Sequence, residues 1–139
     1  MPRKTSLLII SILGIVSVWM LSRALFSNLT TNSSYDLQLG FTANHEFPKI
    51  NGSSNDFMNT APLTAIAIYP DQKESLFQAQ LYITKRGDKE ILQQEKMRET
   101  SDLAAFEMRL HNLDWEKGDY TLYFQRGLDI QESLDFTLR

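Results

Sequence analysis

The stretch Phe-Gln-Ala-Gln-Leu-Tyr-Ile-Thr-Lys-Arg-Gly-Asp, residues 77–88, decides the fold class. Apolar side chains occupy every second position from Phe77 to Ile83, and polar ones or Tyr82 fall between them. Successive side chains of a strand point to opposite faces, so this period of two predicts a strand with one face on a core. Residues 85–88 are typical of a hairpin turn. We therefore expect the chain to return as a second strand from Ile91 to Met97.

The same alternation recurs on both sides of this hairpin. The runs are Tyr35 to Phe41, Phe106 to Leu110, Tyr120 to Phe124 and Leu134 to Leu138, with a more continuously apolar run from Leu63 to Tyr69. Together they make about seven strands at regular spacing, the pattern of an antiparallel β-sandwich. We expect an all-β domain over residues 35–139.

The segment around Phe106 admits two interpretations. Ser101-Asp102 is suited to cap a helix whose apolar face would consist of Leu103, Phe106, Leu110 and Leu113. Strict alternation from Phe106 to Leu110 fits a strand equally well. We expect the strand, because the segments on both sides are strands and a sheet has to continue.

The run from Leu110 to Phe124, Leu-His-Asn-Leu-Asp-Trp-Glu-Lys-Gly-Asp-Tyr-Thr-Leu-Tyr-Phe, leads into the penultimate predicted strand. It resembles the corresponding turn of immunoglobulin-like and fibronectin type III-like sandwiches, where a leucine, a glycine turn and a tyrosine form a corner. The resemblance implies that the Tyr120 hydroxyl bonds back to the loop backbone, with Leu113 and Gly118 in the other two roles. It also implies a last strand within residues 128–139.

The first 26 residues have the pattern of a signal anchor that forms one transmembrane helix. Arg3 and Lys4 precede an uncharged run of roughly 18 residues, close to the shortest length that spans a ~30 Å hydrocarbon core. Trp19 lies where aromatic belts form, and Arg23 can reach the interface so that the helix continues beyond it. With the basic start in the cytoplasm, the rest of the chain faces the periplasm or the outside.

A cleaved signal peptide is the alternative to the anchor. Ser22 and Ala24 are small residues at the two positions that signal peptidase inspects, which permits cleavage after Ala24. Residues 27–34 are rich in Ser, Thr and Asn and carry too little apolar surface to fold, so they are predicted to be a flexible spacer.

Composition argues against several classes of function. The formal charge of −3 provides no basic field for nucleic acid. The chain has no cysteine, which rules out thiol nucleophiles, disulfides and cysteine-ligated metals, and favours a bacterial envelope over an animal ectodomain. It also lacks Gly-x-Ser-x-Gly and a glycine-rich phosphate loop. We expect no enzyme, no catalytic residues and no cofactor.

Metal binding has only weak candidates in the sequence. His45 and His111, the two histidines, lie far apart, and we expect one in a loop and the other on the polar side of a strand. Asp114, Glu116 and Asp119 share one predicted loop and suit weak calcium binding, but solvated turn residues are the simpler interpretation. A periplasmic metal- or small-ligand-binding module stays as an alternative function, and a pilus or surface-fibre subunit is another.

Aromatic residues on the polar side of the strands favour a contact surface. Tyr82 and Tyr123 fall among Gln80 and Gln125, and Trp115 precedes the penultimate strand. Such a face is typical of a docking sheet, although the same residues also suit any strand. The sequence therefore predicts a membrane-anchored accessory or scaffold subunit of a bacterial envelope complex. Its partners would be other membrane or periplasmic proteins, and the lipid bilayer through the N-terminal helix.

Overall fold

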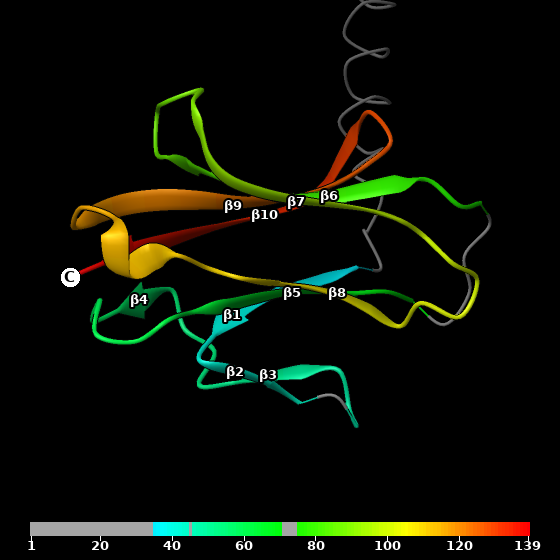
Figure 1. The fold of residues 1–139 in the computed structure, drawn as a ribbon, viewed down its shortest axis with the longest axis horizontal. Coiled ribbons are helices and arrows are strands. Elements are labelled where there is room, and N and C mark those ends of the chain that lie inside the picture. Colours follow the sequence, from blue (N-terminus) through cyan, green and yellow to red (C-terminus); the bar gives the residue numbers. More distant parts are fainter. Residues whose placement is uncertain (1–34, 45, 71–74) are drawn as a thin grey trace, which may run out of the picture. The chain divides into compact units, whose positions relative to one another are not determined.

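A computed structural model describes residues 35–44, 46–70 and 75–139 of the chain. The predicted anchor with Arg3, Lys4, Trp19 and Arg23, and the predicted spacer, lie outside this range. The described residues make up an all-β unit whose one helical element is the single 3₁₀ turn η1, Asn112–Asp114 (Figure 1). Among these residues no helix is long and apolar enough to cross a bilayer.

The strands of the described residues form two larger sheets and one small hairpin. The three-stranded sheet has the order β1 (Asp36–Gly40), β5 (Thr64–Ile68), β8 (Ala105–Arg109). The five-stranded sheet has the order β4 (Asp56–Phe57), β10 (Asp129–Leu138), β9 (Gly118–Arg126), β6 (Gln78–Lys85), β7 (Ile91–Arg98). Strands β2 (Thr42–Asn44) and β3 (Lys49–Asn51) make the hairpin. All neighbours are antiparallel except β4 and β10, which are parallel.

The prediction of an all-β domain is confirmed, and each alternating run contains a strand. Strand β6 covers most of the opening stretch, and β7 begins at Ile91 as expected. The ambiguous segment is strand β8 and not a helix, because alternate side chains such as Phe106 and Met108 are buried in the core. The sequence did not reveal β2, β3 and β4, which at two or three residues are too short to show a period.

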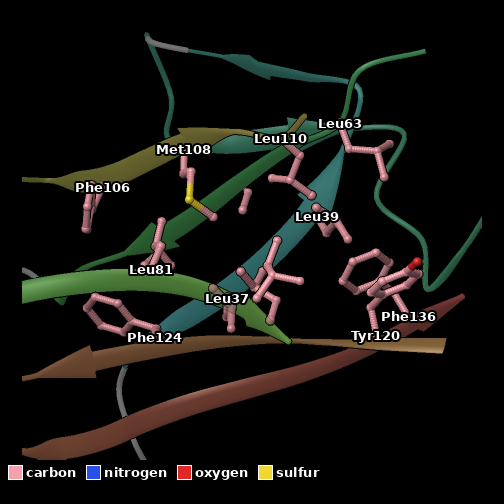
Figure 2. Packing of buried hydrophobic residues seen from close by; sticks show 14 of the residues in the cluster. Leu37, Leu39, Leu63, Leu81, Phe106, Met108, Leu110, Tyr120, Phe124 and Phe136 are labelled. Carbon is pink, nitrogen blue, oxygen red and sulfur yellow. The ribbon is translucent and has the colours of Figure 1, made fainter. Parts of the chain in front are cut away.

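The hydrophobic core lies between the three-stranded and the five-stranded sheet. Leu39 of β1 and Met108 of β8 belong to one buried cluster with Leu81 of β6 and Phe124 of β9, and all four are almost completely buried (Figure 2). Each of the two sheets turns its apolar side chains toward the core. The alternate side chains of each strand lie on the outer face, where polar residues and contacts with other molecules can be accommodated. Burial of this kind is the main source of stability in a domain without disulfides.

Gly40 permits the close approach of the β2–β3 hairpin to β1. A Cβ atom at this position would lie 2.1 Å from Cγ2 of Ile50 and 2.9 Å from the carbonyl oxygen of Asn51. The Ile50 N–H donates to Oε1 of Gln38 over 3.0 Å, which holds the hairpin there. The run from Tyr35 to Phe41, expected as one strand, therefore forms β1 as far as Gly40, and β2 begins only at Thr42.

Gly40→Ala is expected to lower the free energy of unfolding by roughly 2–3 kcal/mol, because the added methyl group overpacks against Ile50. Gly87→Ala is the matched control: its φ of +82° strains the new side chain, but no atom lies within 4 Å of it. That strain alone costs about 1 kcal/mol. Thermal unfolding of the full chain in detergent, followed by circular dichroism, should show the lower melting temperature for Gly40→Ala. Equal melting temperatures would contradict the close approach.

Candidate interaction surface

The outer face of the five-stranded sheet brings together four of the five predicted contact residues. Tyr82 on β6 lies opposite Tyr123 on β9, and their rings stack with centroids 4.8 Å apart and planes 15° apart. Two residues away on each strand, Nε2 of Gln80 donates to Oε1 of Gln125 over 2.9 Å. All four side chains are partly exposed. We name these four residues the tyrosine–glutamine patch.

The phenol hydroxyls of the patch can both donate and accept hydrogen bonds. Burial first, and the neighbouring Tyr123 second, raise the pKa of Tyr82 above its ordinary value of 10.0. A stacked pair of rings therefore presents apolar surface with polar edges and no charge, a combination that is enriched in protein interfaces.

Trp115, the fifth predicted contact residue, lies elsewhere. Its ring packs on Tyr120 with the centroids 5.5 Å apart, at the margin of the core. Tyr120 belongs to the inward phase of β9, so Trp115 covers the core and does not join the outer face. Because Trp115 lies in a loop and not in a strand, alternation in the sequence could not predict which face of the sheet it would contact.

One end of the outer face is occupied by a network of charges. The guanidinium of Arg86 lies 3.6 Å from Oδ2 of Asp119 and 3.5 Å from Oδ2 of Asp135. The hydroxyl of Thr121 donates to Asp135 over 2.7 Å, and that of Thr137 donates to Asp119 over 2.6 Å. These exposed pairs add little stability, but they compensate the charges at this end.

Strand β7 is one edge of the five-stranded sheet and carries mostly exposed residues. Lys96 and Arg98 project from it opposite Gln80 and Gln78. On its other side, Gln93 donates through Nε2 to the Arg109 carbonyl over 2.8 Å and accepts from the His111 N–H over 2.9 Å. Gln93 thus joins β7 to the end of β8.

The predicted corner is present in part. The Tyr120 hydroxyl donates to the carbonyl oxygen of Glu116, a bond of the kind that the resemblance implies, and Gly118 begins β9. Leu113, however, is 51% exposed, and the leucine of this run that enters the core is Leu110 at 2%. Between these two leucines, the fully buried residue of the turn is the polar Asn112.

That residue, Asn112, connects η1 to the loop before β5. Its Oδ1 accepts from the Leu63 N–H over 2.8 Å, and its Nδ2 donates to Oδ1 of Asn59 over 2.7 Å and to the Ala61 carbonyl over 3.0 Å. A buried amide with these partners is satisfied and therefore structural. Nothing in the residues around Asn112 identifies it in the sequence as a buried side chain.

A buried ion pair lies at the end of the domain opposite the corner. Glu99 is only 2% exposed. Its Oε1 accepts from Nε of Arg126 over 2.5 Å and from the Tyr69 hydroxyl over 2.8 Å. Its Oε2 accepts from Nη2 of Arg126 over 2.8 Å and from the Phe77 N–H over 3.0 Å. Both carboxylate oxygens have hydrogen-bond partners, and we interpret the ion pair as an interaction that stabilises the fold.

These partners set the charge state of Glu99. Burial by itself would raise the pKa of Glu99, but the hydrogen bonds from Arg126, the Phe77 N–H and Tyr69 outweigh it and hold the pKa below 4.5. Burial and the bond to Glu99 raise the pKa of Tyr69. The carboxylate is therefore ionised and the phenol neutral at neutral pH.

Of the residues weighed for metal binding, those that the structure describes do not form a site. Among the described residues, no group of three or more His, Asp or Glu side chains could hold a metal ion. Of the predicted calcium loop, Glu116 pairs with Lys85 over 3.0 Å and Asp119 lies near Arg86. His111 is exposed, and His45 lies outside the described residues.

Comparison with known proteins assigns the chain to no family. No protein-family model matches it. No curated protein matches it at a significant level.

The Glu99 pair predicts a loss of stability in acid. Because the folded-state pKa of Glu99 lies below 4.5, the unfolded chain takes up a proton first as the pH falls. The contribution of Glu99 is complete above the unfolded pKa and disappears as the pH falls through the folded pKa. We expect the melting temperature to drop below about pH 4.5 and Glu99→Gln to reduce that dependence.

The measurement is the melting temperature of the full chain between neutral pH and about pH 3, a range that covers the ordinary carboxyl titration. Glu95→Gln, at an exposed position on β7, is the matched control and should keep the wild-type curve. If the melting temperature of Glu99→Gln followed the same pH curve as that of the wild type, the structural role of the ion pair would be contradicted.

Proposed function

We propose that this chain is a non-enzymatic, membrane-anchored accessory or scaffold subunit of a bacterial envelope complex that works by protein–protein contact. The tyrosine–glutamine patch carries this proposal. In Figure 1 the three-stranded sheet lies on one side of the five-stranded sheet, and no described strand lies on the other. The patch is on that uncovered side, in the middle of β6 and β9.

The geometry of the patch suits a docking site. The stacked rings of Tyr82 and Tyr123 hold each other in place, so little side-chain freedom remains to be lost on binding. The hydrogen bond between Gln80 and Gln125 orders the neighbouring amides in the same way. Tyrosine is among the residues that contribute most to binding energy at interfaces.

An immunoglobulin-like or fibronectin type III-like sandwich is the architecture that we propose for the domain. The sheet of β1, β5 and β8 corresponds to strands A, B and E of such domains, and β10, β9, β6 and β7 correspond to G, F, C and C′. The hydroxyl of Tyr120 bonds back to the loop at the start of the penultimate strand, which supports the same assignment. A fold does not imply a function, so the proposal rests on the patch.

The proposed location is the inner membrane, with the N-terminus in the cytoplasm and residues 35–139 in the periplasm or outside. The basic start at Arg3 and Lys4, the apolar run after it and the absence of cysteine support this location. An anchor would hold the domain near a partner in the same membrane and raise their effective concentration. The partners would then be the lipid bilayer and other membrane or periplasmic proteins.

The patch is tested by affinity purification of the full chain from its native membrane, read by mass spectrometry. Tyr82→Thr with Tyr123→Thr keeps strand-forming residues but removes the stacked rings. Loss of two central aromatic contacts should lower recovery of the partner at least about tenfold, the equivalent of roughly 1.4 kcal/mol. The melting temperature of the variant shows whether the domain is still folded.

The matched control is Lys49→Thr with Arg109→Thr, at exposed positions on β3 and β8, which should keep wild-type recovery. Equal recovery with both double variants would contradict docking through the patch. A wild-type chain that purifies alone would contradict the proposal of a complex subunit.

A further inference from the structure

Four exposed apolar side chains lie at the end of the domain that also holds the Glu99–Arg126 pair. They are Leu76, Phe77, Leu128 and Ile130, with exposed fractions of 50%, 45%, 95% and 54%. We name them the apolar tip. Leu128 forms the turn between β9 and β10, where a polar residue would be the usual choice. An apolar residue that is almost fully exposed at such a turn suggests a contact.

The two segments of the apolar tip are side by side. The Gly127 N–H donates to the Gln78 carbonyl over 2.9 Å, and a Cβ on Gly127 would lie 3.3 Å from the ring of Phe77. Ile130 lies opposite Gln125 on the outer face and continues the apolar surface toward the patch. The tip is therefore one surface built from the residues just before β6, the β9–β10 turn and the start of β10.

Two cations flank this surface. Arg98 lines the same hollow as Leu76 and Phe77, and Lys96 lines a second hollow with Gly127. Both side chains are exposed, and within the described part of the chain neither forms an ion pair. Asp129, between Leu128 and Ile130, and Glu132 on β10 are acidic residues near the tip in the sequence. An apolar surface with unpaired cations next to it is the composition of a protein surface that contacts anionic lipid.

The chain enters the domain at the same end. The Arg126 guanidinium lies 5.1 Å from the ring centroid of Tyr35, the first described residue, and 5.1 Å from that of Phe77. The predicted spacer, residues 27–34, can reach at most about 28 Å when fully extended. An anchor that ends near residue 26 would therefore keep this end of the domain close to the bilayer surface.

We propose that the apolar tip inserts into the lipid–water interface of the bilayer that holds the anchor, with Lys96 and Arg98 against anionic headgroups. This inference rests on the proposed membrane anchor. Insertion gives the domain a second attachment and a defined orientation. The β6–β7 turn, which Figure 1 shows at the other end of the sheet from the β9–β10 turn, would then point away from the membrane. The tyrosine–glutamine patch would face sideways, toward a partner in the same membrane.

The absence of cysteine makes a direct test possible, because a single introduced cysteine can be labelled selectively. Leu128→Cys places an environment-sensitive fluorophore on the tip. Lys89→Cys, exposed beside the β6–β7 turn, is the matched control. The full-length chain is reconstituted in vesicles of phosphatidylcholine and phosphatidylglycerol that contain lipids with a quencher on the acyl chain, and flotation reports whether the chain is bound to the vesicles.

The expected result is a blue-shifted emission and several-fold stronger lipid quenching at position 128 than at position 89. Chain that floats with the vesicles but shows equal, weak quenching at both positions overturns the insertion and leaves the anchor intact. Chain that does not float overturns the anchor, and the insertion with it.

The cations are tested in the same assay. Lys96→Ser with Arg98→Ser in the Leu128→Cys chain should reduce quenching in phosphatidylglycerol vesicles to the level seen with phosphatidylcholine alone. Quenching that is the same in both lipid mixtures, with or without these two substitutions, overturns the proposed headgroup contact.

Discussion

The ion pair between Glu99 and Arg126 is the interaction on which the arrangement of one end of the domain depends. Glu99 follows β7 and Arg126 ends β9, while its other partners, Tyr69 and Phe77, follow β5 and precede β6. One carboxylate thus joins the three-stranded sheet to the five-stranded sheet. A buried carboxylate is costly without its partners, so these four chain segments are held together. The positions of Tyr35 and of the β9–β10 turn follow from this arrangement.

The composition of the outer face of the five-stranded sheet follows from the alternation of its strands. Leu81 and Leu122 have to face the core, and the period of a strand then places Tyr82 and Tyr123 outside. The tyrosines stack because β6 and β9 are neighbours in a register that sets them opposite each other. The core and the tyrosine–glutamine patch are therefore two consequences of one alternating pattern, and the patch lies on strands whose other face is buried in the core.

Alternation, a local property, was sufficient to predict the main strands, their buried side chains and the outward position of Tyr82, Tyr123, Gln80 and Gln125. It could not predict features that depend on distant residues. Phe41 continues the period but is 43% exposed, because β1 ends at Gly40. Glu99 and Arg126 are far apart in the sequence and look like ordinary charged residues at strand ends. Trp115 and Leu113 lie in a turn without a period, where only the three-dimensional packing decides which side chain is covered.

The most direct test of this account is a double-mutant cycle on Glu99 and Arg126, measured as free energies of unfolding of the full chain in detergent. Arg126→Met alone leaves a buried carboxylate unpaired and should cost about 3–5 kcal/mol. In the Glu99→Gln background the same change should cost about 2–3 kcal/mol less, because no charge is left without a partner. Additive effects of the two substitutions would contradict the claim that this pair holds the two sheets together at the end where the chain enters.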